Sequence, residues 1–168
     1  MPPRSAPPPH HDAFHAITTI GAWINNADTK TGLLAAALTV LTGGAVRQRP
    51  RVEVLLDAGP GSRGVVALVA LGTCAVFLAL AGVCLFRALR PRLTNTQDSR
   101  FAFPYLADAD LDRLIDDDPV AVRAEAWVHA QTLSKIVRAK YGCLSSALTH
   151  GVVAGLAFVA WLLLVPIP

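Results

Sequence analysis

Two long apolar runs limit what this chain can fold into. Residues 65–86 and 144–165 each contain 22 residues, and apart from thiols their only titratable side chain is His150. At about 1.5 Å per residue, each run makes a helix about 33 Å long, enough to cross a hydrocarbon core of about 30 Å. Because helices satisfy their own backbone hydrogen bonds in such a core, both runs are predicted to be transmembrane helices.

A third apolar run, residues 31–46, has only 16 residues. It spans a membrane if Lys30 and Arg47 extend their charged ends to the two interfaces. The alternative is a re-entrant or interfacial helix. The whole chain is 16% charged, against about 25% for soluble domains. The predicted fold class is therefore all-α: an integral membrane protein with three transmembrane helices and a short helical cytoplasmic region.

Basic residues near the spans predict the orientation. Seven of them lie beside the membrane on the side of the 88–141 region, and four lie in the first loop. Because short loops rich in Lys and Arg stay inside, we expect a cytoplasmic N-terminus and an external C-terminus. The predicted segments are a Pro- and His-rich disordered arm at 1–13, a cytoplasmic helix continuous with the first span at 14–46, an external loop at 47–63, a second span at 64–87, the cytoplasmic helical region at 88–141 and a third span at 142–166.

The first predicted helix carries a carboxylate on its packing face. Asp28 falls at helical spacing with Phe14, Ile17, Gly21 and Ile24, whereas Trp23 falls on the opposite side. An unpaired charge on a packing face is costly, so Asp28 needs a partner. We expect either a cation from the basic run at 135–140 or hydrogen bonds at a helix end.

A second helix is predicted to start at Asp118-Pro119, with Asp as the N-cap and Pro at the first helical position. No glycine interrupts it before Gly142, so it extends to Tyr141 and can continue into the third span. Its apolar stripe consists of Val122, Ala126, Ala130, Leu133 and Val137. A polar stripe runs beside it and contains Arg123, Trp127, Gln131, Ser134, Arg138 and Tyr141.

The basic run of Lys135, Arg138 and Lys140 has two interpretations. It is either a juxtamembrane topology signal or a phosphate site, because cations and the hydroxyls of Ser134 and Tyr141 suit a phosphodiester. Trp127 either stacks on a base or packs in a core. The net charge of +3 is explained by membrane topology, so no nucleic-acid partner is expected.

Two features lie in the third span. Ala147, Gly151 and Gly155 form a stripe of small residues that serves either packing within the chain or self-assembly. His150 is either an intramembrane functional residue or an interfacial one. We find no motif for an enzyme, a metal or a cofactor, so neither catalytic activity nor a cofactor is expected.

Three motifs together resemble the transmembrane type of Pycsar effector protein. They are Trp23-Ile24-x-x-Ala27-Asp28-x-Lys30-x-x-Leu33-Leu34, the aromatic segment Phe101-Ala-Phe103-Pro-Tyr105-Leu106, and the run from Gln131 through Lys135, Lys140 and Tyr141 to Ala147. Their order and spacing agree over roughly residues 14–165.

The resemblance implies an effector of antiphage defence in the bacterial inner membrane. A partner pyrimidine cyclase would make cyclic CMP (cCMP) or cyclic UMP (cUMP). The effector would bind this messenger and impair the membrane, causing growth arrest or abortive infection, with membrane lipid and further copies of itself as partners. The alternative is a ligand-independent membrane scaffold or holin-like protein. The expected nucleotide-binding residues are Lys30, Trp127, Ser134, Lys135, Arg138, Lys140 and Tyr141.

Overall fold

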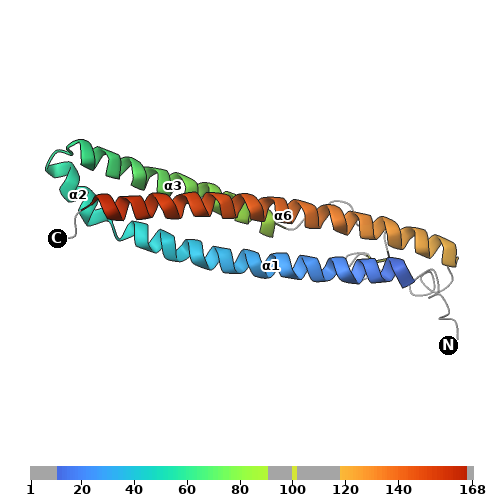
Figure 1. Ribbon diagram of the computed structural model, residues 1–168. Helices are drawn as coiled ribbons and strands as arrows, with labels where there is room; N and C mark the ends of the chain where they lie inside the picture. The colour runs from blue at the N-terminus through green and yellow to red at the C-terminus, as the bar shows by residue number, and fades with distance from the viewer. Residues whose placement is uncertain (1–10, 91–99, 102–117, 166–168) are drawn as a thin grey trace, which may run out of the picture. The chain divides into compact units, whose positions relative to one another are not determined.

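The computed structural model describes residues 11–90, 100–101 and 118–165. These residues form α1 (His11–Val46), α2 (Arg49–Asp57), α3 (Ser62–Leu89) and α6 (Pro119–Leu164), and no strand occurs among them (Figure 1). Three helical stretches are long and apolar enough to cross a membrane. The predicted all-α membrane fold is therefore confirmed.

The structure differs from the sequence prediction at the start of the first helix and in the first loop. The first helix begins at His11, three residues before the predicted start, because Ala13 is buried and Asp12 lies favourably in the positive first turn. Residues 1–10 of the predicted arm lie outside the described residues. The predicted loop at 47–63 contains α2, which has Pro in its first turn and an ion pair of 2.9 Å between Arg49 Nε and Glu53 Oε1.

The other boundaries follow local chemistry. Gly59 takes a positive φ of 72° between α2 and α3, a conformation that glycine adopts without a steric penalty. Arg90 is extended after α3, as expected of a residue that precedes a proline. Asp118 caps α6, because its Oδ1 accepts a hydrogen bond of 3.1 Å from the Val120 amide. The helix then runs without a break from Pro119 into the third predicted span.

The described residues belong to two compact units. One, called the first unit, contains residues 11–27, 100–101 and 118–139. The other, called the membrane unit, contains residues 28–90 and 140–165. The stretches 91–99 and 102–117 of the predicted cytoplasmic region, including most of its aromatic segment, lie outside the described residues.

Small side chains at intervals of seven residues form the interior of the membrane unit. In α3 the buried residues include Ala67, Cys74, Ala81 and Ala88. A seven-residue period keeps one face of a helix towards its neighbours, and small residues let backbones approach closely. Leu38 of α1 packs with Ala81 and Leu85 of α3 and with Ala147 of α6. Large apolar side chains face outwards, where lipid can cover them: Val40, Val69 and Leu163 are 78%, 63% and 74% exposed.

A buried tryptophan joins α2 to α6. Trp161 is fully buried with Ala67 and Val165, and Val52 and Leu55 of α2 pack against this cluster. Its indole Nε1 donates a hydrogen bond of 3.3 Å to Gln48 Oε1. The short helix is therefore fixed against the end of α6 by both apolar contact and a polar bond.

The small stripe of α6 packs inside the chain at two of its three positions. Ala147 is completely buried. A Cβ atom at Gly151 would lie 3.1 Å from Leu38 Cδ2, whereas one at Gly155 would meet nothing within 4 Å. Gly151 therefore lies against α1, and Gly155 faces open space in this single chain.

This difference predicts unequal effects for one substitution at the two glycines. Gly151→Leu should lower the free energy of unfolding by about 1–3 kcal/mol, because a large side chain must displace Leu38. Gly155→Leu, in the same helix, is the matched control and should change it little. Thermal unfolding of the full chain in detergent micelles measures both. Equal losses at both sites would contradict the packing of α6 on α1.

Candidate functional site

An ion pair joins α1 to α6 within the membrane unit. Lys140 Nζ lies 2.5 Å from Asp28 Oδ1. The Lys140 side chain is only 19% exposed, whereas that of Asp28 is 44% exposed. A largely buried ammonium needs a carboxylate to offset its lost hydration, and Asp28 supplies it. The predicted pairing of Asp28 with a cation of the 135–140 run is thereby confirmed.

A pocket lies beside this ion pair. The Lys30 ammonium is 5.9 Å from the centre of the Tyr141 ring, within reach of a cation–π interaction. The pocket has a volume of about 420 Å³. Lys30, Tyr141 and Ser145 contribute to its lining, and four leucines supply apolar walls. These leucines are Leu33, Leu34, Leu144 and Leu148.

The structure divides the predicted nucleotide-binding residues between the two units. Lys30, Lys140 and Tyr141 lie in the membrane unit, with Lys140 engaged by Asp28. The other four lie on α6 in the first unit: Trp127, Ser134, Lys135 and Arg138.

The first-unit candidates lie on an exposed face of α6. Trp127 is 45% exposed, and Lys135 and Arg138 are exposed as well. The Ser134 hydroxyl donates a hydrogen bond of 2.9 Å to the Ala130 carbonyl oxygen of its own helix. Because Trp127 is 45% exposed, the core-packing interpretation of this residue is not supported. Trp23 of the signature is also exposed, at 55%.

The first unit also contains a row of three rings. The Phe101 ring centre lies 5.7 Å from that of Phe14 and 6.0 Å from that of His129. Beside the row, Arg100 Nε lies 2.8 Å from Glu125 Oε2. Phe101 belongs to the predicted aromatic segment, whereas its polar neighbours Arg100, Glu125 and His129 were not among the predicted site residues.

His129 is buried, with 7% of its surface exposed. Burial lowers the pKa of His129 below its ordinary value of 6.5, and the nearby Glu125 opposes this shift. The sequence did carry a signal for this burial, because His129 follows Ala126 by one turn and precedes Ala130 on the apolar stripe.

His150 lies within the third predicted span, in the membrane unit. It follows the start of the apolar run at residue 144 by six residues, which corresponds to about 9 Å in a hydrocarbon core of about 30 Å. Its ring centre is 5.7 Å from that of Phe77. Its buried Nδ1 atom has no hydrogen-bond partner among the described residues. The intramembrane and the interfacial interpretation of His150 both stay predictions.

A family model described as the Pycsar effector protein domain (PycTM) matches residues 12–167. The chain belongs to this family. Comparison with curated proteins and with solved structures found no match.

Family membership supports a role as an antiphage defence effector. It also implies that the Pycsar effector works with a cyclase and a cyclic nucleotide signal in general. The three apolar helices and the transmembrane family together make it a membrane protein. The match covers both units, so the ion pair, the pocket and the ring row all lie within the family domain.

The ion pair predicts a specific pattern of stability losses in this Pycsar effector. Asp28→Asn leaves the Lys140 charge largely buried without its carboxylate. The free energy of unfolding should fall by about 1–3 kcal/mol, between the values for exposed and buried pairs. Chemical unfolding of the full chain in micelles measures this loss, with the exposed Asp57→Asn as the control.

A double variant separates the charge from the shape of the pair. Asp28→Leu combined with Lys140→Met removes both charges at once, so most of the stability lost in Asp28→Asn should return. A double variant that is less stable than Asp28→Asn would contradict this. It would show that the attraction between Asp28 and Lys140, and not only the cost of an unpaired ammonium, holds the helices together.

The His129 environment predicts acid sensitivity. As the pH falls through 6.5, the unfolded chain binds a proton at this histidine while the folded chain does not. The free energy of unfolding should therefore decrease below pH 6.5, and His129 should contribute no pH dependence above it. His129→Gln should flatten this slope, whereas the exposed His15→Gln should leave it unchanged. An identical slope in wild type and His129→Gln would contradict the assignment.

Proposed function

We propose that this Pycsar effector binds a cyclic pyrimidine mononucleotide, cCMP or cUMP, and in response impairs the bacterial inner membrane. A partner pyrimidine cyclase supplies the messenger during phage infection, and membrane damage then arrests growth or kills the cell. The observation that carries the proposal is the family match over residues 12–167, together with three helical stretches that can cross a membrane.

The pocket beside the ion pair is the proposed messenger site. A cyclic mononucleotide presents one negative phosphate, one sugar and one flat pyrimidine. Lys30 offers a cation for the phosphate, Ser145 carries a hydroxyl group, Tyr141 contributes its ring, and the leucines form a wall for the base. The volume of about 420 Å³ falls within the range of small-molecule sites, about 300–1,000 Å³.

The location of this pocket suggests how binding reaches the membrane. Lys30 precedes the apolar run at 31–46, and Tyr141 precedes the run at 144–165. Both helices continue through these points without a break. A messenger that prefers one packing of α1 against α6 would therefore change the packing of the spans themselves, to the extent of its preference between the two states.

Self-assembly through the small stripe is not part of the proposal. Ala147 and Gly151 already pack against α1 or α3 within one chain, so only Gly155 is open to another copy. A membrane lesion formed by several copies would need other outward-facing apolar residues, of which the membrane unit has many.

Nucleotide titration of the purified full chain tests the site. A charge-assisted hydrogen bond contributes about 1.5–3 kcal/mol, so Lys30→Ala should weaken cCMP or cUMP binding about tenfold or more. Lys135→Ala is the matched control from the exposed face of α6. A loss in Lys135→Ala alone would transfer the site to that face. Unchanged binding in both variants would place the site elsewhere, and no binding to wild type would overturn the proposed sensing.

Dye entry into cells tests the consequence of binding. Cells that express the effector should admit a membrane-impermeant dye when the matching cyclic nucleotide is present and exclude it otherwise. Equal dye entry without any nucleotide would support the ligand-independent, holin-like alternative instead.

A further inference from the structure

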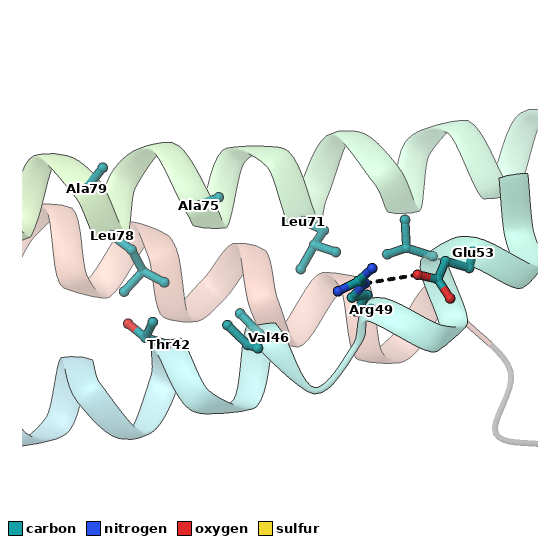
Figure 2. A pocket seen from close by; sticks show the side chains of 10 residues that line it. Thr42, Val46, Arg49, Glu53, Leu71, Ala75, Leu78 and Ala79 are labelled. Atoms are coloured by element: carbon teal, nitrogen blue, oxygen red, sulfur yellow. Dashed lines mark hydrogen bonds and ion pairs between the residues drawn. The ribbon is translucent and has the colours of Figure 1, made fainter.

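A second, larger groove lies at the other end of the membrane unit. It has a volume of about 770 Å³ and lies between the end of α1, α2 and α3. Figure 2 shows Leu71, Ala75 and Leu78 of α3 facing Thr42 and Val46 of α1. The ion pair of Arg49 with Glu53 lies at one end of this groove (Figure 2). The proposed messenger pocket shares no lining residue with this groove.

Small residues keep the groove open. Ala45, Ala75 and Ala79 line it, and their short side chains leave the space between α1 and α3 unfilled. Ala75 and Ala79 are exposed, so the groove opens outwards. In a membrane this opening faces the lipid.

The groove covers about one leaflet of the bilayer. Counted along α1 from Lys30 at about 1.5 Å per residue, Thr42 lies about 18 Å and Val46 about 24 Å away. In a hydrocarbon core of about 30 Å, both residues occupy the half that is farther from Lys30. Arg49 follows Val46 after a short turn, so it lies near the boundary with the headgroups.

The segment that carries α2 has a net positive charge. Residues 47–63 contain four arginines, Arg47, Arg49, Arg51 and Arg63, and two carboxylates, those of Glu53 and Asp57. Glu53 accepts from the Nε atom of Arg49, and the Nη atoms of Arg49 have no partner among the described residues. A guanidinium with free Nη hydrogens suits a phosphate.

We propose that this groove binds one anionic phospholipid, with an acyl chain between α1 and α3 and the phosphate at Arg49. An apolar slot of one leaflet's depth with a cation at its headgroup end fits this ligand. A second copy of the chain docked face to face would bring two positive surfaces together, which disfavours that occupant. The lipid site is independent of the proposed messenger.

Native mass spectrometry of the full chain tests the lipid site. The protein is extracted in mild detergent and exchanged with phosphatidylglycerol or phosphatidylcholine of identical acyl chains. The wild type should retain one phosphatidylglycerol per chain and prefer it over phosphatidylcholine about fivefold, the effect of one basic residue near an anionic headgroup.

Charge variants should move this preference in opposite directions. Arg49→Gln should abolish most of it, whereas Glu53→Gln should increase it, because the phosphate then no longer competes with a carboxylate. Both residues are exposed, so neither change should unfold the chain. No preference in the wild type, or the same shift in both variants, would overturn the phosphate contact.

Groove-filling variants test where the acyl chain lies. Ala75→Phe should remove bound lipid of both kinds, and Ala79→Phe, deeper in the groove, repeats the test if Ala75→Phe fails to insert. Val76→Phe adds a similar ring on the same helix outside the lining and should retain lipid. Equal retention in all variants would overturn the proposal. A change in oligomer mass with Ala75→Phe, without lipid loss, would assign the groove to a second copy instead.

Discussion

Close approach of helices through small side chains is the constraint on which the membrane unit depends. Ala67, Cys74, Ala81 and Ala88 repeat every seven residues in α3, and all are buried. In hydrocarbon, apolar side chains gain little by leaving lipid for one another, so helices associate through tight van der Waals contact. Alanine provides that contact by letting the backbones come near. Many of the larger residues, such as Val40, Val69 and Leu163, are consequently left on the outside, where they face lipid.

The ion pair of Asp28 and Lys140 complements this packing at one end. Dispersion alone does not select which residue of α1 faces which residue of α6, because many registers bring small residues together. An ammonium that is largely removed from water does select, since it requires its carboxylate at hydrogen-bond distance. The pair therefore fixes the level at which Lys30 meets Tyr141, and with it the shape of the neighbouring pocket.

The two ends of the membrane unit offer different chemistry. The end at Lys30 has a small pocket with a cation, an aromatic ring and a hydroxyl group. The end at α2 has a larger apolar groove with arginines beside it. A cyclic nucleotide arriving from water and a phospholipid already in the bilayer suit these two sites respectively. Both sites use α1, so the packing of this one helix bears on both.

The sequence by itself determined the three long helices and the family. Uncharged runs of sufficient length predict spans, and Asp118-Pro119 predicts the start of α6, because both depend on local composition. For Asp28 the sequence left two partners open, a cation of the 135–140 run or a helix end, and the structure decided for Lys140. The helix α2 was missed because its nine residues, rich in Arg and Pro, resemble a loop. Its Val52 and Leu55 pack against Trp161, which is distant in sequence.

Only the tertiary structure decided which residues are available to a ligand. Lys140 and Lys135 are both lysines of one basic run, yet one is engaged by Asp28 and the other is exposed. The rings beside His129 and His150 come from other segments, Phe101 and Phe77 respectively, so the sequence around each histidine does not identify them. The groove beside α2 is likewise a space between three helices. Such features arise from contacts distant in sequence, which composition and periodicity do not encode.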